Sequence, residues 1–126
     1  MNKIAYVCGP YRAETKEEIE ANIRNAERVA RSLWAYNIPT FCPHLNTQHF
    51  DGLCPDELFL EFDKVILRDI CSLLVLLPIW ERSSGSKEEL LDVLEQPFEL
   101  YDILVISSIE NCEKEIREYV ERIRGK

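Results

Sequence analysis

Short apolar runs alternate along this chain with longer segments in which apolar residues recur every three or four positions. The runs have the length of β-strands, and the three-to-four spacing is typical of a helix that buries one face. The predicted strands span residues 4–8, 38–42, 73–77 and 103–106, and the predicted helices begin near Thr15, Pro55, Lys87 and Glu110. Residues 98–101 fit either a strand or the tail of a helix. Strands that alternate with helices predict an α/β fold, a single doubly wound parallel sheet of flavodoxin-like or Rossmann-like type with helices on both faces.

The first predicted helix has the clearest ends. Thr15 and Glu18 form a capping-box pattern at its start. Asn37, which tolerates left-handed backbone geometry, and the following Pro39 end it. We expect Trp34 to lie in the core. The buried face of this helix is predicted to carry Ile19, Ile23, Ala26, Ala30 and Leu33.

The other helices and the third strand supply the rest of the predicted core. Pro55 fits the first turn of the second helix, where a missing N–H does no harm. We interpret Asp63 in the same helix as a solvated charge. Residues 73–77 show no apolar–polar alternation, which indicates a central parallel strand covered on both sides. The predicted inner faces carry Leu58, Phe62, Val65 and Ile66 in the second helix, and Ile116, Tyr119, Val120 and Ile123 in the last.

Composition narrows the classes of partner and location. With 126 residues and no repeat, low-complexity tract or linker, we expect one domain covering residues 1–126. A net charge of −8 would repel DNA or RNA, although a local anion site could still hold a small phosphorylated ligand. No apolar run is long enough to span a bilayer, and we expect neither a signal peptide nor a membrane partner. Five cysteines without a C-x-x-C pair indicate a reducing, cytoplasmic location.

Ligands of doubly wound folds bind in the loops beyond the carboxyl ends of the strands. Three loops therefore matter: 9–13, 43–52 and 78–86. The third contains Ser83-Ser84-Gly85-Ser86 just before a helix, where hydroxyls and free backbone N–H groups can bind an anion.

Glu89 follows this serine-rich segment in the first turn of the predicted helix, and the pattern leaves two interpretations open. Ser86-x-x-Glu89 is itself a capping box, so Glu89 could serve only to close its own helix. A carboxylate that faces a strand-end crevice can instead attack a sugar carbon and form a covalent intermediate.

Two segments carry a resemblance to a known family. They are Tyr6-Val7-Cys8-Gly9-Pro10-Tyr11-Arg12 and Leu77-Pro78-Ile79-Trp80-Glu81-Arg82-Ser83-Ser84-Gly85-Ser86-Lys87-Glu88-Glu89. Together they resemble the nucleoside 2-deoxyribosyltransferase family, and within it the branch of 2'-deoxynucleoside 5'-phosphate N-hydrolases and related small phage and microbial proteins. The similarity extends from about Lys3 to Leu94.

The resemblance implies an enzyme that cleaves the N-glycosidic bond of a nucleotide without a metal or organic cofactor. Glu89 would attack the anomeric carbon and hold the sugar as a glycosyl ester, and the Tyr6 hydroxyl would orient Glu89. Gly9 and Arg12 would belong to the loop over the sugar and phosphate. Ser83 stands where nucleoside-preferring transferases carry Asp and phosphate-preferring hydrolases carry Ser, which implies a 5'-monophosphate substrate. Base exchange, or nucleotide binding without turnover, are the alternatives.

The chain departs from the family pattern just before the central strand. Many relatives have Cys-Asp there, whereas this chain has Cys71-Ser72. The upstream Asp69 either supplies the carboxylate instead or lies on an exposed helix end. We therefore leave the general acid unassigned, and we expect Glu88, the neighbour of Glu89, to point to solvent.

The middle loop is expected to lie over the base. His44 follows the second strand, where relatives place base-contacting residues, and it is either a ligand contact or a loop histidine without a role. Trp80 could border the pocket from the third loop. A metal-binding domain is the rival interpretation, but the spacing of the candidate ligands fits no compact zinc site. Those candidates are Cys42, His44, His49 and Cys54.

Ser107 and Ser108 bear on the oligomeric state. The family forms homodimers, and Ser107-Ser108 resembles the segment that reaches into the phosphate pocket of the neighbouring subunit. Ser107-x-x-Glu110 also fits a capping box for the last helix. The resemblance thus implies a homodimer whose Ser107 contributes to substrate binding, with helix capping as the alternative.

Overall fold

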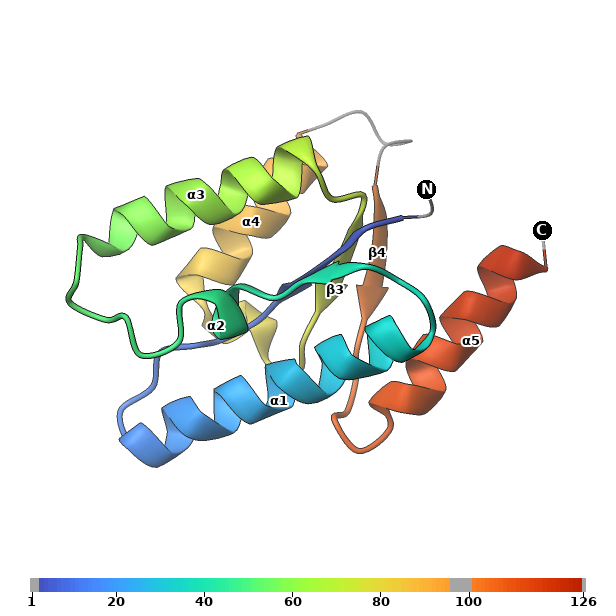
Figure 1. Cartoon of the computed structure of the whole chain (residues 1–126), viewed down its shortest axis with the longest axis horizontal. Helices are drawn as coiled ribbons and strands as arrows, with labels where there is room; N and C mark the ends of the chain where they lie inside the picture. Colours follow the sequence, from blue (N-terminus) through green and yellow to red (C-terminus); the bar gives the residue numbers. More distant parts are fainter. Residues whose placement is uncertain (1–2, 96–100, 126) are drawn as a thin grey trace.

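A parallel sheet forms the centre of the molecule (Figure 1). The computed structural model describes residues 3–95 and 101–125. Within them the sheet has four strands, which pair in the order β2-β1-β3-β4 and all run in the same direction. The strands are β1 (Ala5–Cys8), β2 (Thr40–Phe41), β3 (Leu73–Leu76) and β4 (Asp102–Val105). This order confirms the predicted parallel α/β fold.

Helices cover both faces of the sheet, as predicted (Figure 1). On one face, α1 (Lys16–Ala35) and α5 (Cys112–Arg124) contribute to one buried apolar cluster, which also contains Ala5 and Val7 of β1. On the other face, α3 (Asp56–Asp69) and α4 (Ser84–Leu94) contribute Leu67 and Val93, which pack against the alternate β1 residues. A short helix, α2 (Pro43–Asn46), follows β2, and a 3₁₀ turn, η1 (Trp80–Arg82), follows β3.

The strand order creates a crevice at the carboxyl ends of β1 and β3. The chain leaves β1 for β2 on one side and then crosses to β3 on the other side of β1. Connections that depart in opposite directions leave an opening between the two strand ends, where ligands of doubly wound folds bind. The two central strands, residues 5–8 and 73–76, are fully buried and hold this crevice rigidly.

The observed helix ends agree in part with those predicted from the sequence. The Thr15 side chain accepts a hydrogen bond from the Glu18 N–H at 3.1 Å, which confirms the predicted cap of α1. Asn37 has a positive φ of 63°, as expected of a residue that ends a helix in left-handed geometry. Pro55 lies at the N-cap of α3 and not in its first turn. α4 begins three residues before the predicted Lys87, at Ser84.

The predicted inner face of α3 is largely wrong. Leu58, Phe62 and Val65 are 54%, 48% and 40% exposed, whereas Leu67 is fully buried. The helix carries apolar residues on several sides, so periodicity alone could not select the buried side. Trp34 was expected in the core but is 56% exposed. Of the segment 98–101, residues 98–100 lie outside the described residues.

None of the helices in the described ranges is both long and apolar enough to cross a membrane.

Candidate functional site

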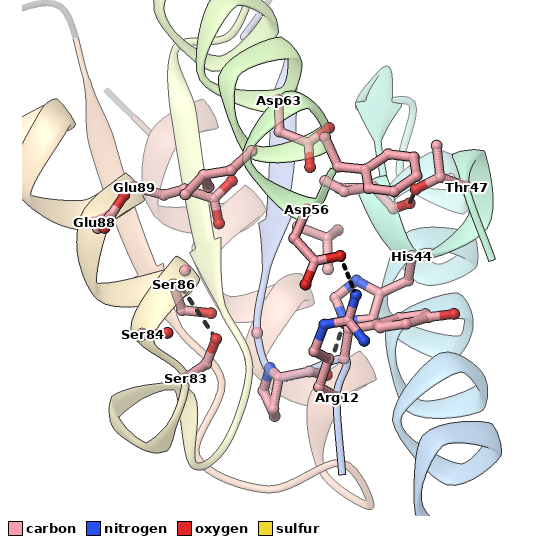
Figure 2. Close-up of a pocket in the computed structure, with 18 of the residues that line it drawn as sticks. Arg12, His44, Thr47, Asp56, Asp63, Ser83, Ser84, Ser86, Glu88 and Glu89 are labelled. Carbon is pink, nitrogen blue, oxygen red and sulfur yellow. Dashed lines mark hydrogen bonds and ion pairs between the residues drawn. The ribbon is translucent and has the colours of Figure 1, made fainter. Parts of the chain in front are cut away.

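A cavity of about 430 Å³ opens at the crevice between the ends of β1 and β3 (Figure 2). Its walls are the three loops that the sequence predicts, together with the facing sides of α3 and α4. This volume lies in the range of pockets that enclose small organic ligands. Of the predicted site residues, Tyr6 and Ser107 do not line the cavity, although Tyr6 contacts Glu89, which does. The others line it: Gly9, Arg12, His44, Ser83, Gly85, Ser86 and Glu89.

Glu89 is a buried carboxyl group with two side-chain partners from β1. Only 7% of the residue is exposed. The Tyr6 hydroxyl donates a hydrogen bond to Oε2, and the Cys8 Sγ lies 3.6 Å from Oε1. Burial, with a smaller contribution from the Asp92 carboxylate, raises the pKa of Glu89 to about 8. Glu89 is therefore held in one orientation beside the cavity.

The capping interpretation of Glu89 is wrong. Ser83 caps α4, and its side chain accepts a hydrogen bond from the Ser86 N–H at 3.1 Å. Ser86 lies inside the helix, so the Ser86-x-x-Glu89 pattern falls three residues too late to form a capping box. The Glu89 carboxyl is thus available for a role other than helix capping.

Cys8 was not singled out as a site residue from the sequence. It is buried, as expected of a free cysteine in a strand, and burial raises its pKa to about 12. The thiol therefore stays protonated and can donate to Glu89 or to the Ser86 carbonyl, which lies 3.7 Å away. Because alternate residues of a strand share a face, Tyr6 and Cys8 both reach Glu89.

Gly9 is required by a close approach of two loops. A Cβ at this position would lie 2.6 Å from the Cβ of Leu77, at the end of the central strand. No side chain fits there without moving the backbone. The loop after β1 therefore lies directly against the loop after β3, and this contact shapes the floor of the crevice.

Arg12 lines the cavity and is paired with two carboxylates, of which Figure 2 shows Asp56. Its guanidinium lies 2.6 Å from Asp56 and 3.6 Å from Asp51. The neighbouring Tyr11 hydroxyl donates to Asp51 at 3.0 Å and accepts from the His49 N–H at 2.9 Å. These contacts use at most two of the five guanidinium N–H donors, so Arg12 keeps N–H groups with which it can bind a phosphate.

The N-terminus of α4 offers hydrogen-bond donors to the cavity. Ser86 is 1% exposed, lines the cavity, and its Oγ has no hydrogen-bond partner within the described chain. Ser84 and Gly85 belong to the same first turn, whose backbone N–H groups have no acceptor within the helix. An unpartnered hydroxyl beside the positive end of a helix dipole is an arrangement that binds anions.

Asp63 lines the cavity as well, although the sequence indicated no role for it in the site. It is half-buried on α3 and lines the cavity, and burial raises its pKa to about 7 (Figure 2). The interpretation as a solvated charge is therefore wrong. The spacing of residues in the sequence could have indicated this position. Asp63 stands three residues after Leu60 and four before Leu67, on the side of α3 that faces the cavity and core.

The other acidic candidates lie at the edge of the site or away from it. Glu88 is exposed, as expected, and its carboxylate lies 3.2 Å from the Lys64 ammonium, at the cavity rim. Asp69 lies at the exposed end of α3 beside Arg68, 3.5 Å away, and does not line the cavity. Trp80 packs against the core and does not border the cavity.

Ser107 follows β4, away from the cavity of its own chain. Its N–H and its hydroxyl each donate to the Glu115 carboxylate at 3.0 Å. The capping alternative for Ser107 is wrong, because α5 begins at Cys112 with Asn111 at its N-cap.

In the ranges that the structure describes, no three His, Cys, Asp or Glu side chains gather into a group that could hold a metal ion. The metal-binding interpretation of the middle loop therefore gains no support from the structure.

A comparison of the chain with models of protein families found no match, and neither did a comparison with curated proteins. The resemblance to nucleoside 2-deoxyribosyltransferases remains a prediction from the two motifs, and the functional argument depends on the geometry of the site.

Proposed function

We propose that the protein hydrolyses the N-glycosidic bond of a nucleoside 5'-monophosphate through a covalent glycosyl ester on Glu89. The observation that carries the proposal is a buried carboxyl group, held by the Tyr6 hydroxyl, at the wall of a cavity of nucleotide size. A carboxyl group that is buried at a cost in stability and turned toward a cavity is a candidate for chemistry.

The first chemical step needs a nucleophile and a proton donor. The deprotonated Glu89 attacks the anomeric carbon, the C–N bond breaks, and its electron pair leaves with the base. We propose that the general acid, which the sequence left unassigned, is Asp63, and that it donates the proton that the departing base takes up. Its pKa of about 7 suits a group that gives up and regains a proton near neutral pH.

The second step reverses these roles. Water attacks the anomeric carbon of the glycosyl ester, and the Asp63 carboxylate accepts the proton that this water loses. The sugar phosphate leaves with a new hydroxyl group, and Glu89 is released as a carboxylate. Tyr6 and Cys8 donate hydrogen bonds to Glu89, which stabilises the carboxylate as a leaving group.

The N-terminus of α4 supports a phosphate on the sugar. Ser83, Ser84 and Ser86 surround Gly85 there, and the Ser86 hydroxyl has no hydrogen-bond partner among the described residues. An Asp at position 83 would repel a phosphate, whereas Ser does not. Arg12 lies on the facing loop and would add a charged hydrogen bond through N–H groups that its contacts with Asp51 and Asp56 do not use.

Incubation with a panel of nucleosides and their 5'-monophosphates, followed by assay for free base, tests this function. We expect the monophosphates to be cleaved with a kcat/KM at least about tenfold higher, because each charged hydrogen bond contributes roughly 1.5–3 kcal/mol. When a second free base is added to the mixture, it should not be joined to the sugar phosphate to form a new nucleotide. Faster cleavage of unphosphorylated nucleosides would contradict the phosphate site, and efficient base exchange would contradict hydrolysis. Absence of free base from every substrate would refute the function.

We also propose that two copies of the chain associate through α3 and α4, which pack against each other. Both helices expose apolar side chains, namely Leu58, Phe62 and Val65 on α3, and Leu91 and Leu94 on α4. A second copy would cover them, as expected for apolar patches of this kind. The resemblance separately implies that the partner's Ser107 contributes to the phosphate site; within its own chain Ser107 donates to Glu115 of α5.

Light scattering tests the dimer with matched variants. The double variant Phe62→Glu and Leu91→Glu should be monomeric and less active, because it places charges in the proposed interface. Trp34→Glu is the control, since Trp34 is equally exposed but lies on α1, on the opposite face of the sheet. A monomeric wild-type protein, or a dimer that survives the double variant, would refute the α3–α4 interface.

A further inference from the structure

His44 is a buried histidine, and one of its ring nitrogens has no partner in the part of the chain that the structure describes. Only 5% of the residue is exposed, and it lines the cavity. Its Nε2 lies 2.9 Å from the carbonyl oxygen of Pro10. The other ring nitrogen, Nδ1, is buried and has no hydrogen-bond partner within the described chain. Buried polar atoms are normally paired, so this atom calls for a hydrogen-bond partner that the described chain does not supply.

The Pro10 carbonyl fixes the tautomer of His44. A carbonyl oxygen only accepts hydrogen bonds, so the Nε2 of His44 must carry the hydrogen. Burial lowers the pKa of His44, and the ring therefore stays neutral. In a neutral ring with hydrogen on Nε2, Nδ1 is a hydrogen-bond acceptor only. The atom that lacks a partner thus requires an N–H or O–H donor.

The strand order shows which part of a nucleotide would reach His44. His44 follows β2 and Glu89 follows β3, and β1 lies between these two strands. Adjacent strands are roughly 4.8 Å apart, which separates the two strand ends by about 10 Å. Figure 2 shows the two side chains on opposite sides of the cavity. With the sugar at Glu89, the far edge of the base would lie at His44.

We propose that His44 accepts a hydrogen bond from the exocyclic amino group of the base, so that the site selects amino-bearing bases of the adenine or cytosine type. This inference rests on the proposed function, which places the sugar at Glu89. An oxo base of the hypoxanthine or uracil type presents a carbonyl oxygen at the same position. Two acceptors would then face each other, and both would remain unpaired.

Calorimetric binding to the Glu89→Gln protein, in which turnover is blocked, tests the inference. The ligands are the 5'-monophosphates of adenosine, inosine, cytidine and uridine and of their 2'-deoxy forms. We expect each amino-bearing nucleotide to bind about tenfold more tightly than its oxo counterpart, because a site built for a donor rejects an analogue that lacks it. Equal binding of the two kinds of nucleotide, or tighter binding of the oxo nucleotides, would overturn the inference. This experiment alone is sufficient for that and needs no variant of His44.

Variants of His44 then assign the effect to this residue. His44→Phe should reduce the ratio to about one, mainly through weaker binding of the amino-bearing nucleotides. His44→Gln should restore much of it, since a glutamine amide can donate to Pro10 and still present an oxygen. Thr47→Val, at the same cavity wall, is the control and should keep the ratio. An unchanged ratio in His44→Phe would overturn the inference.

A nucleotide with an unsubstituted purine, which lacks the amino group, separates a base donor from a sugar hydroxyl. If His44→Phe weakens this ligand as much as the adenine nucleotide, the donor lies on the sugar and the inference is wrong. The proposed function fails independently, by absence of base release from protein with Glu89 intact. If the protein binds amino-bearing nucleotides more tightly than oxo nucleotides but releases no base, the proposed function fails and the His44 inference stands. If no nucleotide binds, both the proposed function and the His44 inference are refuted.

Discussion

Replacement of Glu89 by alanine is expected to lower base release by at least about 10³-fold, because no other group in the proposed mechanism can form the glycosyl ester. Glu88→Ala is the matched control. Glu88 is the adjacent residue with the same side chain, but it is exposed and paired with Lys64. That variant should keep most of the activity. Comparable base release in the Glu89 variant would show that another group is the nucleophile.

Loss of activity in position 89 variants must be separated from loss of fold. The pKa of Glu89 is raised from 4.5 to about 8, so the folded state holds this proton more tightly than the unfolded state does. Stability is therefore lost as the pH rises from about 4.5 to 8, by up to about 3 kcal/mol at pH 7. Glu89→Gln removes this penalty, and its melting temperature should exceed that of the wild type, increasingly so toward pH 8. A lower melting temperature across this range would indicate that Glu89 serves the fold.

Replacement of Asp63 by asparagine should lower kcat by about 10²- to 10⁴-fold, the usual contribution of a general acid. In the wild type, Asp63 must be protonated, so activity should fall as the pH rises above about 7. Glu89 must be deprotonated, and its deprotonated fraction falls as the pH drops below about 8. The reactive combination of protonated Asp63 and deprotonated Glu89 is therefore most populated between these two values. The expected profile is a bell centred between these values, and Asp63→Asn should lose the alkaline limb.

Two controls make the Asp63 assignment specific. Asp69→Asn alters a carboxylate of the same helix that lies outside the cavity, and it should leave kcat unchanged. A 7-methylpurine nucleotide releases a neutral base without protonation, so Asp63→Asn should slow its cleavage far less than that of an ordinary purine nucleotide. An equal loss on both substrates would show that Asp63 does not act as the proton donor.

The sheet and most helices could be predicted from the sequence because their signals are local. A run of apolar residues such as 73–77 can only be a buried strand or a short buried helix, and its length favours the strand. The capping box at Thr15 is likewise contained within four residues. These features depend on neighbours along the chain, and the structure reproduces them.

The site was only partly predictable because its contacts are long-range. Tyr6 and Glu89 are 83 residues apart, and only the family resemblance linked them before the structure did. The proposed role of Asp63 was missed because α3 has apolar residues on several sides, so the sequence does not show which side is buried. A carboxylate in such a helix is then interpreted as exposed to solvent. A helix rotated so that Leu58 and Phe62 face inward would turn Asp63 away from the cavity. The error at the core and the error at the site therefore have one cause.

The buried carboxyl group of Glu89 also has an evolutionary consequence. Marginally stable proteins tolerate a destabilising group only while selection maintains what that group does. In a lineage released from catalysis, exchange of Glu89 for glutamine would be favoured for stability alone, and random mutation would supply it by a single base change. Copies of this chain that diverge while they keep the acid would therefore record continued selection for chemistry. Copies that carry glutamine above an intact Tyr6 and cavity would mark descendants retained for binding.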